Sequence, residues 1–103
     1  MIELVERQVE KLNELCAEHK VKELYLFGSA ATDEFDEKSS DLDFVVEFTD
    51  AIDPIDFADY YFSFLDGLKT LFEGDVDLLS YTSLKNDVII QQIEDTKVQL
   101  YAT

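Results

Sequence analysis

The predicted fold rests mainly on the pattern in residues 27–48, "FGSAATDEFDEKSSDLDFVVEF". A glycine and a serine, Gly28 and Ser29, follow a short hydrophobic segment, and two aspartates, Asp41 and Asp43, stand where the next hydrophobic segment begins. Because side chains alternate along a strand, both carboxylates point to the same face, with Cα atoms roughly 6.5–7 Å apart. Like charges at that spacing repel one another unless a cation lies between them. The pair therefore predicts a cation site at the beginning of a strand.

Hydrophobic periodicity predicts a helix or strand on either side of this stretch. Apolar residues at spacings of three and four indicate helices, and strict alternation indicates strands. The expected elements are helix 2–19, strands 23–27 and 42–48, a helix from Pro54 to about Phe72, strand 76–81, a helix capped by Thr82 or Ser83, and strand 98–102. The order α-β-β-α-β-α-β predicts an α/β (α+β) fold, a small mixed sheet covered by helices. We expect residues 1–103 to form a single domain.

The charge of the chain narrows the classes of partner. Asp and Glu number 24 against 8 Lys and Arg, which gives a net charge of −16. Phosphate-rich surfaces would be repelled, so we expect no direct nucleic-acid partner and no membrane partner. A small anionic ligand carried by a metal ion, or a basic protein, remains compatible with this charge. The sequence has one cysteine, Cys16, and no apolar run of membrane-spanning length, so we expect a cytoplasmic protein without an internal disulfide.

A third carboxylate, Asp77, lies early in the expected strand 76–81. If that strand neighbours the strand that Asp41 and Asp43 begin, the three carboxylates gather at one site. Such a set is typical of two-metal phosphoryl or nucleotidyl transfer. Gly28 would allow a ligand to approach the backbone, and Ser29 with the amides after it could bind phosphate oxygens. Because acidic residues are so abundant, a chance pairing of solvated aspartates is the alternative.

These motifs together resemble the DNA polymerase β-like nucleotidyltransferase superfamily, and in particular its minimal nucleotidyltransferases. The resemblance rests on "LFGS", "SDLDFVVEF" and the later Asp77, and covers almost the whole chain. It implies that Gly28 and Ser29 bind the nucleotide and that ATP is the substrate. It also implies that Asp41, Asp43 and Asp77 are catalytic residues that hold two Mg²⁺ ions, with Asp77 as general base for the incoming hydroxyl.

The resemblance also implies a partner and a reaction. Many such proteins are antitoxins whose partner is an all-helical HEPN ribonuclease toxin, and they move AMP from ATP to a tyrosine of that toxin. We therefore expect an adenylyltransferase that acts as a type VII-like antitoxin on a HEPN-domain protein. Whether the chain forms homo- or hetero-oligomers is left open.

The segment after the Gly-Ser pair departs from the family pattern. The family often reads "GSRARG", whereas this chain has Ala30, Ala31 and Thr32, without arginines to neutralise phosphate. The alternative is therefore a catalytically degenerate antitoxin that neutralises a HEPN partner by binding only. A third interpretation is a transferase acting on a cationic small molecule such as an aminoglycoside, although such enzymes usually carry a second domain.

Overall fold

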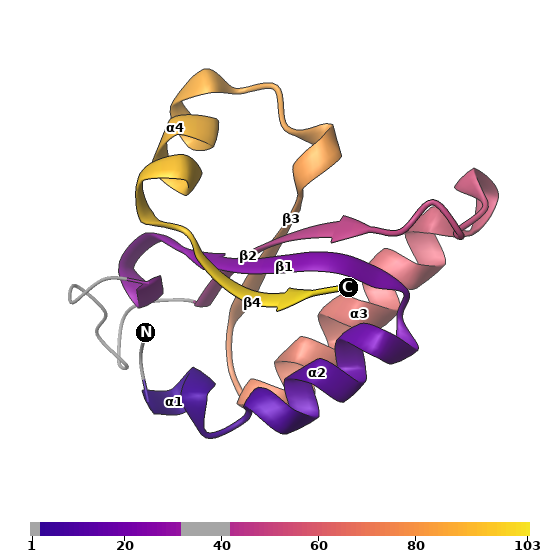
Figure 1. Ribbon diagram of the computed structural model, residues 1–103, viewed down its shortest axis with the longest axis horizontal. Helices are drawn as coiled ribbons and strands as arrows, with labels where there is room; N and C mark the ends of the chain where they lie inside the picture. The colour runs from indigo at the N-terminus through magenta and orange to yellow at the C-terminus, as the bar shows by residue number, and fades with distance from the viewer. Residues whose placement is uncertain (1–2, 32–41) are drawn as a thin grey trace.

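The structure is a computed structural model that describes residues 3–31 and 42–103, and it has the predicted order of elements (Figure 1). Strands 42–48 and 98–102 were predicted with the bounds that they have, and the other two strands differ by one or two residues. The helices in these ranges are α1 (Glu3–Glu6), α2 (Val9–Glu18), α3 (Phe57–Phe72) and α4 (Asp87–Thr96). The strands are β1 (Val21–Phe27), β2 (Leu42–Phe48), β3 (Val76–Ser80) and β4 (Val98–Ala102). Short 3-10 helices are η1 (Gly28–Ala31), η2 (Pro54–Asp56) and η3 (Tyr81–Ser83).

The described strands form one mixed sheet in the order β3-β2-β1-β4. β1 is antiparallel to both β2 and β4, and β2 is parallel to β3. The parallel pair requires a crossover, which α3 provides. As a result, the end of β1 and the beginnings of β2 and β3 meet at one edge of the sheet. This edge carries the Gly-Ser pair and the predicted carboxylates.

The two faces of the sheet are covered differently. α2 and α3 lie beside each other on one face, and α4 lies on the opposite face (Figure 1). We call these the α2/α3 face and the α4 face. The larger core cluster lies on the α2/α3 face and consists of Val5, Leu12, Cys16, Val21, Leu24, Leu26, Leu42, Phe44, Val46, Phe64, Leu68, Phe72, Val76 and Leu78. The smaller cluster on the α4 face has three buried members, Phe27, Val45 and Ile93.

The first helix is broken where the sequence predicts one continuous helix. α1 ends at Glu6 and α2 begins at Val9, with a turn in which the amide of Gln8 donates to the carbonyl of Val5 at 3.1 Å. Val5 and Leu12 are both fully buried on the same cluster. The apolar spacing therefore continues across the break, and periodicity alone does not reveal it.

The predicted cap of the last helix is wrong. Thr82 and Ser83 belong to η3, and α4 is capped by Asn86. The side-chain oxygen of Asn86 accepts from the amides of Val88 at 2.9 Å and Ile89 at 3.3 Å. Ser, Thr and Asn are all favourable caps, so the sequence offers three choices within five residues that propensity does not separate. None of the helices in the described ranges is long and apolar enough to cross a membrane.

Candidate active site

Gly28 lies at the centre of the candidate site, where β1 ends and η1 begins. Its backbone has φ of +72°, in the left-handed region that side chains other than glycine rarely adopt. A Cβ at this position would lie 3.0 Å from Oδ2 of Asp43. Backbone conformation and lack of space both favour glycine here. Gly28 thus brings the backbone against the Asp43 carboxylate.

Asp43 and Asp77 lie next to each other across the parallel strands β2 and β3. They are register partners, and neighbouring strands are separated by about 4.8 Å. Asp43 is half-buried and Asp77 is exposed. The amide of Leu42 donates to the carbonyl of Asp75 at 3.3 Å, which ties the beginnings of the two strands together. The condition on which the three-carboxylate hypothesis depended, that the two strands be neighbours, is met.

The structure says less about the other two predicted site residues, Ser29 and Asp41. Asp41 lies outside the described residues, directly before β2. Ser29 follows Gly28 in the backbone of η1. Residues 3–31 and 42–103 contain no group of three or more His, Cys, Asp or Glu that could hold a metal ion. The structure therefore brings together Gly28, Asp43 and Asp77, and the roles of all five residues stay predictions.

The donor set at this edge of the sheet fits Mg²⁺. Carboxylate oxygens are the ligands that this ion prefers, and one or two of them suffice when substrate phosphates supply the rest. Asp43 and Asp77 provide two such groups in register. Gly28, which has no side chain, allows the backbone to lie close to Oδ2 of Asp43.

Two residues of α4 complete the surroundings of Gly28 and were missed by sequence reasoning. The amide of Gly28 donates to Oγ1 of Thr96 at 2.9 Å, and the Thr96 hydroxyl donates to the carbonyl of Gln92 at 2.7 Å. The carboxamide nitrogen of Gln92 lies 3.8 Å from the position of a Cβ on Gly28. No motif marks these residues, because their proximity arises only when α4 crosses the sheet.

Tyr61 connects α3 to the strand that carries Asp77. Its hydroxyl donates to the carbonyl of Leu78, the residue after Asp77. Burial raises the pKa of the Tyr61 hydroxyl, and the negative charge of Asp77 raises it further. The phenol therefore stays neutral and remains a donor. This hydrogen bond holds the edge strand β3 in place, so that Asp77 stays in register with Asp43.

The end of α4 is held by a charged cluster outside the carboxylate pair. Lys97 lies 3.1 Å from Oε2 of Glu94 and 5.0 Å from the centre of the Tyr25 ring. The hydroxyl of Tyr81 donates to Glu94. Lys97 and Glu94 are each partly exposed, so the ion pair contributes little by itself. Its position anchors the C-terminal turn of α4, which carries Thr96.

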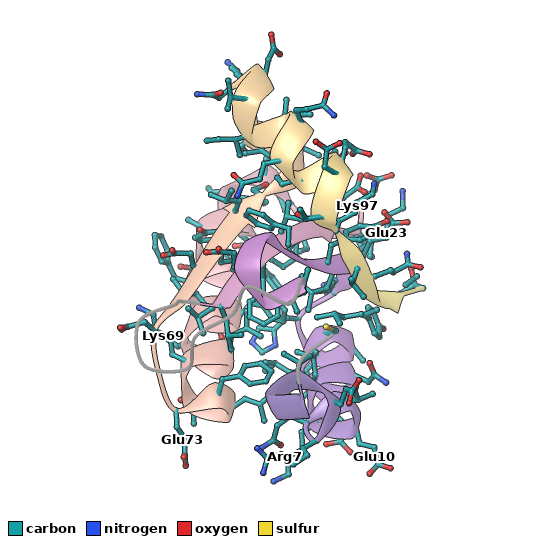
Figure 2. All side chains as sticks on the ribbon, turned by 90° about the vertical axis from the view of Figure 1, so that its left-hand side faces the viewer. Arg7, Glu10, Glu23, Lys69, Glu73 and Lys97 are labelled. Carbon is teal, nitrogen blue, oxygen red and sulfur yellow. The ribbon has the colours of Figure 1, made fainter. Side chains whose placement is uncertain are left out.

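The arginines that the family pattern often has after the Gly-Ser pair are absent from this sequence. Figure 2 places Arg7, the only arginine of the chain, at the end of the molecule opposite α4. The same view shows Lys97 near Glu23, at the C-terminal end of α4. The family pattern "GSRARG" has arginine at positions 30 and 32, where this chain has Ala30 and Thr32. Ala31, at the position where the pattern also has alanine, is partly buried against the larger core cluster.

Comparison with known proteins identifies the protein family to which this chain belongs. The family described as "Polymerase beta, Nucleotidyltransferase" matches residues 10–103. The chain belongs to this nucleotidyltransferase family. A search of curated proteins found no match.

Solved structures give more specific similarities. A toxin–antitoxin complex with AMP-PNP is matched at 28% identity and a TM-score of 0.69, over 92% of this chain and 73% of that one. A tri-AMPylated HEPN toxin of Shewanella oneidensis in complex with an MNT antitoxin is matched at 26% identity and a TM-score of 0.64, over 95% and 72%. A minimal nucleotidyltransferase is matched at 24% identity and a TM-score of 0.67, over 94% and 95%, and supports the fold alone.

Proposed function

We propose that this protein is an Mg²⁺-dependent adenylyltransferase that moves AMP from ATP to a tyrosine hydroxyl of a HEPN-type toxin, and so acts as a type VII-like antitoxin. The observation that carries the proposal is the convergence of Gly28, Asp43 and Asp77 at one edge of the sheet. Family membership supports the reaction class. The solved relatives support the nucleotide and the partner, since one contains AMP-PNP and another an AMPylated HEPN toxin.

The residues divide the reaction between them. Gly28 and Ser29 would accommodate the phosphates, and Asp41, Asp43 and Asp77 would hold the metal. When bound, Mg²⁺ neutralises charge on the phosphate oxygens. Asp77, exposed on its strand, accepts the proton of the incoming tyrosine hydroxyl. Exposure suits this role, because the hydroxyl belongs to a second protein that approaches from outside.

The chemical step is an in-line displacement at the α-phosphorus of ATP. The tyrosine oxygen forms a bond to that phosphorus, and the bond between the α-phosphorus and its bridging oxygen to the β-phosphate breaks. Pyrophosphate leaves with the electron pair, and the tyrosine proton passes to Asp77. The protein contributes position and charge, which are the main terms in phosphoryl-type transfer.

The test is transfer of label from α-labelled ATP, with Mg²⁺, to a HEPN protein encoded beside this chain. We expect label on the toxin with the wild-type protein and none with the double variant Asp41→Ala, Asp43→Ala. Asp66→Ala, which removes an exposed carboxylate of α3, is the matched control and should transfer normally. Equal label from the double variant and the wild type would refute the catalytic role of the pair.

A binding-only antitoxin is the second candidate, and Ala30 and Thr32, which stand where the family pattern has arginines, favour it. In that case the double variant of Asp41 and Asp43 would neutralise the toxin in growing cells as well as the wild type does. An enzyme requires the opposite result, loss of neutralisation in the double variant with normal neutralisation by Asp66→Ala. Growth and label transfer, measured on the same variants, separate the two candidates.

A further inference from the structure

A hollow on α4 adjoins the edge of the sheet where the candidate site lies. It has a volume of about 510 Å³ and is lined by Asp87, Val88, Gln91, Gln92, Asp95 and Thr96. These residues form two rows with a spacing of four, which places them on neighbouring stripes of one helix surface. The described residues of the lining therefore share one face of α4.

The hollow begins at Gly28 and extends away from it along the helix. Thr96 accepts the hydrogen bond of the Gly28 amide, and Gln92 places its carboxamide beside the same glycine. Val88 is two helical turns earlier on the same row, about 12 Å from Thr96 at 1.5 Å per residue. Figure 1 shows α4 above the end of β1, where η1 begins. A ligand whose phosphates lie over Gly28 would extend its other end along this row.

The side chains of the hollow suit a nucleoside better than phosphate. Val88 is 77% exposed and gives an apolar surface on which a flat ring can lie. The carboxamide of Gln92 can donate and accept, as the edge of a nucleobase requires. Asp87 and Asp95 bring negative charge, which repels phosphate but can accept hydrogen bonds from ribose hydroxyls. Asp95 is already oriented by Nε2 of Gln91, at 2.8 Å.

We propose that the α4 hollow binds the base and ribose of the nucleotide, with Gln92 and Val88 as its recognition residues. The inference rests on the proposed function, because it takes the phosphates to lie over Gly28 and the carboxylates. It assigns the nucleoside to α4, a helix without any of the five predicted site residues. Thr96 is a positioning residue, since it holds the Gly28 amide rather than the ligand.

The experiment compares binding of Mg²⁺–ATP with binding of Mg²⁺–triphosphate, measured by calorimetry on the full chain. Triphosphate lacks the nucleoside, so the ratio of the two affinities isolates the contribution of the hollow. We expect Gln92→Ala to weaken Mg²⁺–ATP roughly fivefold, as for the loss of one hydrogen bond, and to weaken Mg²⁺–triphosphate less, because the Gln92 carboxamide also borders Gly28. Val88→Asp should weaken Mg²⁺–ATP at least as much, because it replaces the apolar surface with a charge.

The matched control is Gln8→Ala, which removes a glutamine between α1 and α2. It should leave both affinities unchanged. If wild-type protein binds Mg²⁺–ATP more tightly than Mg²⁺–triphosphate and neither α4 variant alters that ratio, the inference is overturned while the proposed function stands. If the wild type binds neither compound, the proposed function and the inference both fail. Equal weakening of both compounds by the α4 variants would show a general disturbance of the site and would also overturn the inference.

Discussion

The two faces of the sheet differ in what they contribute to the protein. The α2/α3 face carries the larger apolar cluster, which includes the fully buried Phe44 and Phe64. The α4 face has a buried cluster of three residues, with partly buried hydrophobic side chains such as Leu79 and Ile89 packed against it. Hydrogen bonds and a partly exposed ion pair lie at the end of α4. The candidate site lies at the edge of the α4 face. Stability is therefore concentrated on the α2/α3 face, which leaves the α4 face free to present polar groups to a ligand.

The largest expected effect comes from the α2/α3 face. Phe64→Ala removes a fully buried ring that contacts the ring of Phe48 at 6.1 Å between centroids. Because a cavity remains, we expect a loss of about 3–5 kcal/mol in the free energy of unfolding, measured in urea. Phe62→Ala is the matched control, since Phe62 is on the same helix but 60% exposed. It should cost under about 1 kcal/mol. Equal losses in the two variants would contradict the assignment of stability to the buried side of α3.

The next largest effect is expected at Asp43, where a substitution should reduce label transfer but change the free energy of unfolding little. Asp43→Asn keeps the shape of the side chain and removes its charge, so we expect label transfer to fall roughly 100-fold or more. The free energy of unfolding without Mg²⁺ should change by less than about 1 kcal/mol, because removal of a repulsive charge beside Asp77 offsets other losses. Calorimetry with Mg²⁺–triphosphate should show a matching loss of affinity. A large loss of stability with unchanged affinity would make Asp43 a structural residue.

A smaller effect concerns the hydrogen bond between α4 and Gly28. Thr96→Val keeps the side-chain volume but removes the oxygen that accepts from the Gly28 amide at 2.9 Å. We expect a loss of about 1 kcal/mol in the free energy of unfolding. Nucleotide affinity should fall as well, because the turn at Gly28 is no longer held. Thr96→Ser retains the hydroxyl, so we expect it to recover more of the nucleotide affinity than of the free energy of unfolding. If Thr96 had a purely structural role, the two quantities would recover in proportion.

The fold and part of the site could be predicted because their signals are local. The alternation in 42–48 places Phe44 and Val46 on one face and Asp43 on the other, and the structure has this arrangement. Gly28 and Asp43 lie within one short motif, so their proximity follows from a single hairpin-like pairing of β1 and β2.

The contribution of α4 could not be predicted in the same way. The hydrogen bond between Gly28 and Thr96 joins residues 68 positions apart. Its formation depends on the path by which α4 crosses the sheet, and no local pattern specifies that path. The choice of cap among Thr82, Ser83 and Asn86 only shifts the start of the helix by about one turn, which leaves the direction of each helix face unchanged.

The smallest expected effect is a gain in the free energy of unfolding on the α2/α3 face, without a change in nucleotide affinity. α3 ends at Phe72, and the next residue, Glu73, has φ of +52° in the left-handed region although a glycine, Gly74, follows it. A side chain is disfavoured there, so Glu73→Gly should raise the free energy of unfolding by about 0.5–1 kcal/mol. Glu73→Ala removes the same charge but keeps a Cβ, and should give no such gain. The measurement is urea unfolding of both variants beside Mg²⁺–ATP affinity, which we expect to be unchanged because α3 ends away from α4 (Figure 1). A gain of equal size in both variants would assign the effect to charge rather than to the backbone.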